Sequence, residues 1–305
     1  MRFTNCIRVL ISLPCVWVAA SAVLGDDTKP PSPNSKSVAE WVQQLKDPKP
    51  EARVQAAQML ALLGPKAKEA TPALVAEMRS EPSHTLPDPK MDAAKALWKV
   101  DSARYLEELK GKNREEKWTA VFALIYIGPE AKEAIPTLVE MIKNHRDDNR
   151  PHALLALGHL DPDANLALPL LVDALHDRLG QYTRMMAAQG LEAMGVKAKP
   201  AAQNLREALD DEDILVRVHA ARALWVVDKQ TASVLPVLKA ALKDRQRGAG
   251  QQAVYTLGRM GADAKPAFTA LLEAYQGETN KFLQSEMATT LKRIDPEAAA
   301  KAGIR

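Results

Sequence analysis

The stretch GPKAKEATPALVAEM at residues 64–78 decides the fold, because residues 128–141 read GPEAKEAIPTLVEM, almost the same phrase. A catalytic motif seldom needs a second copy in one chain, whereas a structural module does. The repetition therefore predicts a modular chain, in which one supersecondary unit recurs at a fixed period.

A landmark pattern recurs along the chain: Leu, two residues, an aliphatic residue, and then Gly or Asp. Its last residues are Gly64, Asp101, Gly128, Asp161, Gly195, Asp228, Gly261 and Asp295, at a mean spacing of 33 residues. Small or apolar residues precede each landmark by one, four, seven and eight positions, which places them on one face of a helix. Gly and Asp both suit a helix end. Each landmark is therefore predicted to end a helix whose apolar face needs neighbouring helices to cover it.

A second helix is predicted after each landmark, because proline recurs there at two fixed distances. Proline follows the landmark by eight or five residues, at Pro72, Pro136, Pro169, Pro200, Pro236 and Pro266. Proline is tolerated in the first turn of a helix, where its missing N–H would be unpaired in any case. The repeated phrase is then the joint between one helix pair and the next.

The helix pairs resemble the short HEAT-like repeats known as PBS-lyase HEAT-like repeats, of an exported bacterial type. The resemblance is carried by ARVQAAQMLALLG at 52–64, TRMMAAQGLEAMG at 183–195 and VRVHAARALWVVD at 216–228. A basic residue lies eleven positions before six landmarks, at Arg53, Lys90, Lys117, Arg150, Arg184 and Arg217, but Gly250 and Gln284 replace it in the last two copies. The tetratricopeptide signature is absent. The resemblance covers residues 37–296 and implies an all-α solenoid, a superhelix of about eight stacked helix pairs, which we assign to residues 37–305. It says little about function, because one fold hosts many functions.

The N-terminal residues read as a targeting segment. A basic start, a short apolar run and small residues before Asp26 predict a signal peptide over 1–25, cleaved after Ala22 or Gly25. Residues 26–36 read as a Pro-rich linker. The expectation is export to the periplasm or the extracellular space, and the alternative is an anchor left as an uncleaved N-terminal helix. Both cysteines lie in the segment, so the mature chain would hold no disulfide or thiolate.

Charge and motif content argue against nucleic acid and against a cofactor. The formal net charge is +3, with basic and acidic residues interspersed rather than gathered in a basic stripe. The stretch DPDAN at 161–165 opens like a calcium loop, but it lacks the later Gly and Glu of that loop. His145, His152 and His159 are spaced seven apart, too far to share one ion, and are interpreted as surface histidines. Deoxyhypusine hydroxylase has similar repeats with His-Glu iron ligands, yet no histidine here is followed by Glu. We expect no metal, no cofactor and no catalytic residues.

The remaining candidate is a binding surface on the concave side, which the second helix of each pair would line. Positions ten, six and two residues before a landmark point away from the core face, at 100° per residue. Large side chains on or near these positions are Trp98, Trp118, Phe122, Tyr126, Leu155, Met185, Trp225 and Tyr255. Aromatic residues and Met are typical of interfaces, although packing between adjacent helices is the alternative. We therefore expect a monomeric, non-catalytic scaffold for a protein or peptide partner, without membrane insertion after cleavage. A lyase-type enzyme or accessory using the same groove is the alternative.

Overall fold

The structure is a computed structural model that describes residues 33–80, 89–111, 113–161, 164–178, 180–244 and 248–304. Lys36–Arg305 form one compact unit, and Met1–Ser35 belong to another. The signal peptide predicted for 1–25 and most of the linker predicted for 26–36 lie outside the described residues. Within the described ranges every regular element is helical. None of the helices found there is both long enough and apolar enough to cross a membrane.

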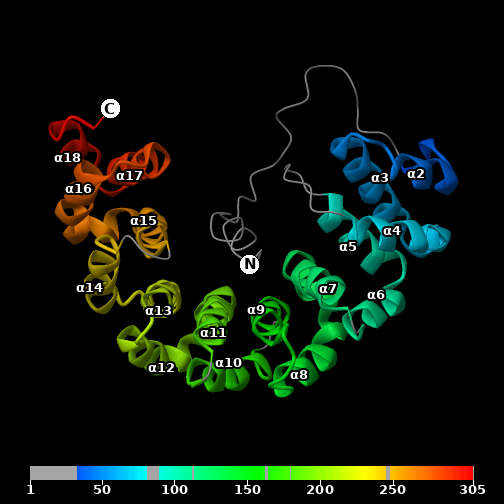
Figure 1. The fold of residues 1–305 in the computed structure, drawn as a ribbon, viewed down its shortest axis with the longest axis horizontal. Helices are drawn as coiled ribbons and strands as arrows, with labels where there is room; N and C mark the ends of the chain where they lie inside the picture. The colour runs from blue at the N-terminus through cyan, green and yellow to red at the C-terminus, as the bar shows by residue number, and fades with distance from the viewer. Residues whose placement is uncertain are drawn as a thin grey trace. The chain divides into compact units, whose positions relative to one another are not determined.

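Helix pairs stack side by side within Lys36–Arg305, and one helix of each pair lies on the concave side of the row (Figure 1). In the described residues the concave side carries eight inner helices. These are α3 (Pro50–Leu63), α5 (Pro89–Val100), α7 (Arg114–Ile127), α9 (Arg150–Leu160), α11 (Gln181–Met194), α13 (Ile214–Asp228), α15 (Ala249–Met260) and α17 (Lys281–Ile294). The outer helices are α2 (Val38–Gln44), α4 (Thr71–Met78), α6 (Ser102–Leu109), α8 (Ile135–Lys143), α10 (Ala167–Leu175), α12 (Ala202–Glu207), α14 (Thr231–Ala241) and α16 (Phe268–Gly277), and α18 (Pro296–Lys301) packs on α17. This arrangement confirms the predicted solenoid of eight helix pairs.

The core lies between the two rows of helices and is built from the leucine four positions before each landmark. Each of these side chains has no exposed surface: Leu60, Leu97, Leu124, Leu157, Leu191, Leu224, Leu257 and Leu291. Small residues bring neighbouring inner helices close together. At the α9–α11 crossing, a Cβ added to Gly158 would lie 2.4 Å from the carbonyl oxygen of Gly190. A larger side chain at Gly158 would therefore have to push these two helices apart.

Two kinds of joint alternate along the solenoid. Gly64, Gly128, Gly195 and Gly261 have φ between 56° and 69°, and each begins a seven-residue 3₁₀ helix (Gly64–Ala70, Gly128–Ala134, Gly195–Ala201 and Gly261–Ala267). A left-handed backbone at these positions favours glycine. At the other joints an aspartate replaces glycine, and Asp101, Asp161 and Asp295 accept backbone N–H groups at the start of the next helix. The joint therefore repeats every second helix pair, which explains why the phrase at 64–78 returns at 128–141.

The prediction that each proline lies in a first turn holds for only some of the prolines. Pro200 and Pro266 lie inside the 3₁₀ helices Gly195–Ala201 and Gly261–Ala267, two residues before α12 and α16 begin. Pro72 and Pro136 lie in the first turn of α4 and α8, but Pro236 lies in the middle of α14. No 3₁₀ helix follows Asp228, and α14 already begins at Thr231, five residues before the proline. The prediction that Pro236 marks a first turn was therefore wrong.

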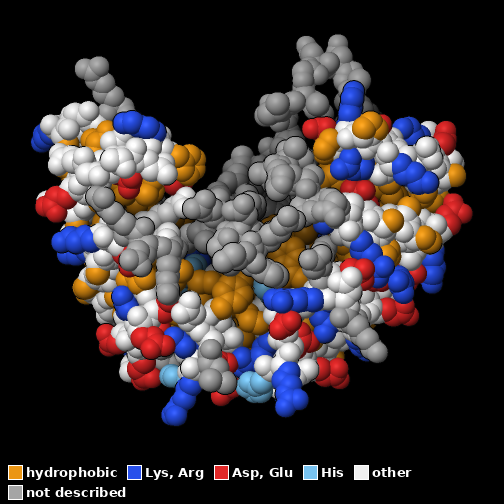
Figure 2. All heavy atoms as spheres, in the orientation of Figure 1, with side chains coloured by type: hydrophobic (Ala, Val, Ile, Leu, Met, Phe, Trp, Pro, Cys, Tyr) orange, Lys and Arg blue, Asp and Glu red, His pale blue; other side chains and the backbone are white. Residues whose placement is uncertain are grey.

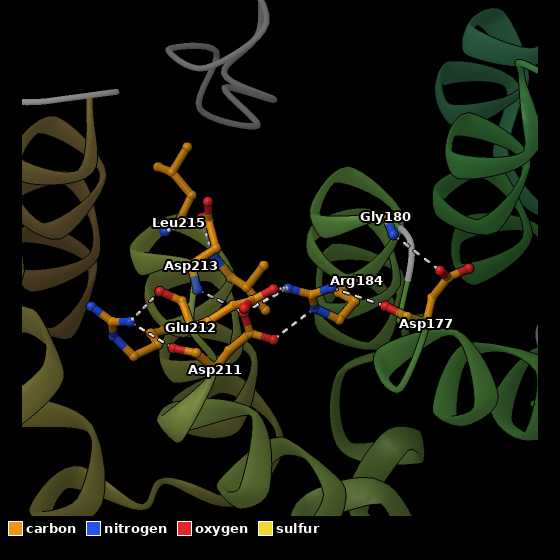
Figure 3. A network of polar contacts seen from close by, with 9 residues as sticks. Asp177, Gly180, Arg184, Asp211, Glu212, Asp213 and Leu215 are labelled. Atoms are coloured by element: carbon orange, nitrogen blue, oxygen red, sulfur yellow. Dashed lines mark hydrogen bonds and ion pairs between the residues drawn. The ribbon is translucent and has the colours of Figure 1, made fainter.

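Three of the basic residues eleven positions before the landmarks, on α7, α9 and α11, tie their helix to the loop of the next pair. Lys117 contacts Asp147 at 2.8 Å, and Arg150 contacts Asp177. Figure 3 shows the third of these pairs, in which Arg184 donates to both carboxylate oxygens of Asp211 at 2.7 and 2.9 Å. Both side chains of that pair are about nine-tenths buried. These cross-repeat ion pairs hold the register between stacked helix pairs.

Candidate functional site

The inner helices present a surface whose middle is apolar and aromatic. Figure 2 shows hydrophobic side chains at the inner rim, over α7 to α11, and mixed Lys, Arg, Asp and Glu along the outer rim. Charged residues such as Lys132 and Glu133, in the 3₁₀ helix between α7 and α8, are exposed. The inner rim therefore carries hydrophobic side chains that lie outside the core.

Three aromatic rings lie along α7 at a spacing of four residues. Trp118 and Phe122 stack with ring centroids 5.1 Å apart and planes 7° apart, and Phe122 meets Tyr126 nearly edge-on at 5.5 Å. Residues four apart share one helix face, so the sequence itself aligns these rings. Tyr126 is 42% exposed, and the other two rings are partly buried. The structure thus brings the three predicted residues of this helix together on the inner surface.

His152 and Tyr182 continue this line of rings across the next two inner helices. Trp118 Nε1 donates to His152 Nε2 at 3.0 Å, and the Tyr182 hydroxyl lies 2.9 Å from the same nitrogen. The His152 ring is edge-on to Trp118 at 6.0 Å and inclined by 64° to Tyr182 at 5.5 Å. We call these five residues, Tyr126, Phe122, Trp118, His152 and Tyr182, the aromatic row.

The hydrogen bonds of His152 fix its tautomer. Trp118 Nε1 can only donate, so His152 Nε2 must be the unprotonated acceptor and the neutral ring carries its proton on Nδ1. That Nδ1 is buried and has no hydrogen-bond partner among the described residues. Burial, with a smaller contribution from the Arg114 charge, lowers the pKa of His152 to about 4. Burial also raises the pKa of Tyr182 to about 12. Both groups are therefore neutral at ordinary pH.

The interpretation as surface histidines holds for His145, which is exposed, whereas His152 and His159 are partly buried and burial lowers the pKa of both. The sequence pattern on one helix did not predict the whole aromatic row, because its second half comes from His152 on α9 and Tyr182 on α11. The spacing held a signal, because His152 follows Trp118 by 34 residues and Tyr182 follows His152 by 30, each about one repeat.

Two predicted surface residues are instead buried. Trp98 and Trp225 are each 7% exposed. Trp98 packs edge-on against Tyr105 of the following outer helix, at 5.4 Å, and Lys229 covers the Trp225 ring at 3.7 Å. Both tryptophans precede their landmark by three residues, a position that turns toward the joint rather than toward the concave surface. As docking residues they are corrected to packing residues.

The other predicted residues lie on the inner helices around the aromatic row. Leu155 on α9 and Met185 on α11 are partly exposed. Tyr255 on α15 lies two helices further on, beneath the guanidinium groups of Arg222 and Arg259 at 5.6 and 5.9 Å. Leu155 and Met185 therefore share α9 and α11 with the row, whereas Tyr255 lies in a separate polar cluster.

That polar cluster links α11, α13 and α15. Arg222 is 8% exposed and donates to Glu192 and to Gln252 Oε1, and its Nη2 lies 3.1 Å from His219 Nδ1. Arg259 also pairs with Glu192. Burial, aided by the Arg222 charge, sets the pKa of His219 well below its usual value. The cluster crosslinks three inner helices and is built mainly from groups that satisfy one another.

The described residues contain no group of three or more His, Cys, Asp or Glu side chains that could hold a metal ion. Asp161, the first residue of the calcium-like stretch, uses its carboxylate to accept the backbone N–H groups of Leu166 and Ala167, both at 2.9 Å. Asp163 of the same stretch lies outside the described residues.

The comparisons with known proteins place the chain in a family. The HEAT repeat family matches residues 103–192 and 202–301, more than half of the chain. The chain therefore belongs to the HEAT repeat family, whose fold is a stacked helical scaffold. No curated protein matches the sequence significantly.

Several solved structures share the fold at low sequence identity. Kap121p bound to Pho4p matches with a TM-score of 0.51 and 14% identity, over 88% of this chain and 34% of that one. Kap121p bound to the SUMO protease Ulp1p gives 0.50 and 14%, over 84% and 33%. The chain thus spans about a third of the length of that karyopherin. The complex of CpcE and CpcF of phycocyanin lyase from Nostoc sp. PCC7120 gives a TM-score of only 0.35 at 16% identity, over 90% and 100%.

Proposed function

We propose that this chain is a non-catalytic scaffold that binds a segment of a protein partner on its inner helices, with the aromatic row at the centre of the site. The observation that carries the proposal is the continuous line of five rings over α7, α9 and α11. At about 8–10 Å between neighbouring helices, the row spans roughly 16–20 Å across the inner surface, enough for several residues of a bound chain.

The character of the row supports binding rather than chemistry. Aromatic side chains offer a large, rigid contact area and often dominate binding energy. His152, the titratable group nearest the centre, is neutral and its Nε2 is already engaged by Trp118 and Tyr182. It therefore serves to hold the rings in place rather than to transfer protons. The solved structures of Kap121p with Pho4p and with Ulp1p show that the same fold carries protein partners in another protein.

Partner capture tests the proposal. The full chain, exported from its host, would be crosslinked there, and the captured proteins compared between the native chain and a Trp118→Ala/Phe122→Ala variant. We expect the variant to lose specific partners while its far-UV circular dichroism is unchanged, because loss of a central aromatic side chain typically costs about 2 kcal/mol of binding or more.

The matched control removes apolar surface from the outer side. Leu166 is 52% exposed and Val196 is 74% exposed, and both lie at outer joints. A Leu166→Ala/Val196→Ala variant should keep every partner. Equal loss in both variants, or a melting point lowered by many degrees in the Trp118/Phe122 variant, would instead assign these rings to packing between helices.

We also propose that the chain is exported and its first residues are cleaved, on the strength of the N-terminal sequence pattern. Determination of the N-terminus of the exported protein tests this, with Val23 or Asp26 expected as the first residue.

A further inference from the structure

We infer that the bound segment of the partner is acidic at one end and apolar along the rest, with its carboxylate at Lys95 and its large apolar side chains on the aromatic row. This inference rests on the proposed function and deepens it, because it names the chemistry of the partner. It is carried by the position and the pairing of one lysine at the Tyr126 end of the row.

Lys95 lies on α5, the inner helix next to α7, with its ammonium group 5.6 Å from the ring centroid of Tyr126. It makes no ion pair with any described residue, and the tyrosine ring is the contact it has. A cation held over an aromatic face remains attractive to an anion on its open side. Since Tyr126 is 42% exposed, a chain lying on the row can reach both groups.

The neighbouring charges differ from Lys95 in being paired. Lys99, one turn further along α5, pairs with Glu130, and Arg114 at the start of α7 pairs with Asp148 at 3.4 Å. Asp92, one turn before Lys95, keeps its negative charge, but its carboxylate is directed toward α3, where it accepts from Gln58 Nε2 at 3.1 Å. Among the described residues, the charge held against the Tyr126 ring is therefore the positive charge of Lys95, and electrostatic complementarity selects a carboxylate there.

The spacing sets the length of the segment. Three steps between inner helices separate α5 from α11, or roughly 24–30 Å at 8–10 Å each. An extended chain rises about 3.3 Å per residue, so about eight or nine residues reach from Lys95 to Tyr182 and Met185. A partner of this class carries an acidic residue followed, or preceded, by large apolar residues within nine positions.

Short peptides test the charge assignment directly. The probes are fluorescein-labelled nonapeptides with the sequences DDSLWSLLS, NNSLWSLLS and KKSLWSLLS, together with SLLSWLSDD for the opposite chain direction. Binding to the full chain is measured by fluorescence anisotropy at low salt. We expect the better of the two acidic probes to bind about tenfold more tightly than the lysine probe, because the acidic probe forms an ion pair with Lys95 and the lysine probe is repelled by it. Added salt should shrink the difference.

A charge reversal provides the sharper result. Lys95→Glu should invert the preference, so that the lysine probe binds more tightly than either acidic probe. The control variant is Lys66→Glu, because Lys66 is exposed at the outer joint that begins at Gly64. That variant should keep the native order of affinities, and circular dichroism should show both variants folded.

The outcomes separate this inference from the proposed function. If all probes bind equally and Trp118→Ala weakens them all, the aromatic site stands and the acidic assignment is wrong. If Lys95→Glu and Lys66→Glu change the preference equally, the charge effect is not local and the inference fails. If no probe binds the native chain, the inference also fails, and the proposed function is then judged by partner capture alone.

Discussion

One ring nitrogen organises the centre of the concave surface. His152 Nε2 accepts from Trp118 and contacts the Tyr182 hydroxyl, so a single acceptor positions side chains from three helices. Protonation of that nitrogen would bring two N–H groups face to face and break the hydrogen bond from Trp118. Burial disfavours the charged form of the ring as well. The neutral ring is thus part of the folded state, which makes the stability of the row sensitive to pH.

The pH dependence follows from the lowered pKa of His152. In the unfolded chain His152 has its ordinary pKa near 6.5, whereas folding lowers it to about 4. Between these values the unfolded state takes up a proton that the folded state excludes, so the free energy of unfolding falls as the pH drops from about 6.5 to about 4. Each pH unit costs up to about 1.4 kcal/mol per histidine. His159 and His219, whose pKa values are also lowered, add to the loss.

Urea unfolding at pH 7 and pH 4.5 measures this effect. His152→Gln keeps an acceptor for Trp118 but cannot take up a proton in this range, so its loss of stability between the two pH values should be smaller than that of the native chain. His145→Gln is the control, since His145 is exposed. The same pH dependence in the His152 variant and the native chain would contradict the assigned role.

At the scale of elements, the cross-repeat ion pairs should contribute more to stability than ordinary surface ion pairs do, because they are buried. Arg184 and Asp211 are only 8% and 10% exposed, and hydrogen bonding to Asp211 raises the pKa of Arg184. Arg184→Ala would leave Asp211 buried without its partner, which typically costs about 3–5 kcal/mol. Arg184→Lys should also destabilise, because an ammonium group cannot make the two parallel bonds of a guanidinium. Thermal unfolding measures both changes.

Arg178 offers the matched control, since it is exposed near the same α10–α11 loop. Arg178→Ala should change stability by less than about 0.5 kcal/mol. Combining Arg184→Ala with Asp211→Asn should cost less than the sum of the single changes, because both remove the same pair. Additive losses would show that the pair is not coupled in solution.

The elements could be predicted from the sequence, because the pattern that defines them is local. Leu four positions before each landmark is fully buried in every described inner helix, as the helical period requires. The candidate site was only half predictable. Tyr126, Phe122 and Trp118 share one helix face, whereas their link to His152 depends on how α7 and α9 are aligned along their axes. Helix periodicity does not fix that alignment.

The same limit explains the error at Trp98. At 100° per residue, a residue three positions before the landmark lies between the core face of the helix and its concave face. Whether it is exposed depends on what the next outer helix brings near it. Tyr105 of α6 covers Trp98, and that contact crosses the aspartate joint. Joint geometry, rather than helix periodicity, therefore decides which large side chains remain at the surface.

At the scale of the whole molecule, the solenoid should respond to damage according to position. Leu224 on α13 and Leu291 on α17 are both fully buried, so Leu→Ala at either site should cost a similar amount locally, about 2–5 kcal/mol. The difference lies in the neighbours. α13 packs against inner helices on both sides, whereas α17 has an inner helix only on the α15 side and the short α18 beyond it.

In a stack where each pair contacts only its neighbours, stability is nearly a sum of repeat and interface contributions. Leu291→Ala should therefore open α16, α17 and α18 while the preceding pairs stay protected. Leu224→Ala should weaken the middle of the stack and raise exchange on both sides of α13, from α11 to α15. Hydrogen exchange with mass spectrometry, at increasing urea below the unfolding transition, resolves the helices separately. Uniform loss of protection over all helices in both variants would mean that the chain unfolds as one cooperative unit. Coupling between distant repeats would then have to exceed what contacts between neighbouring helix pairs supply.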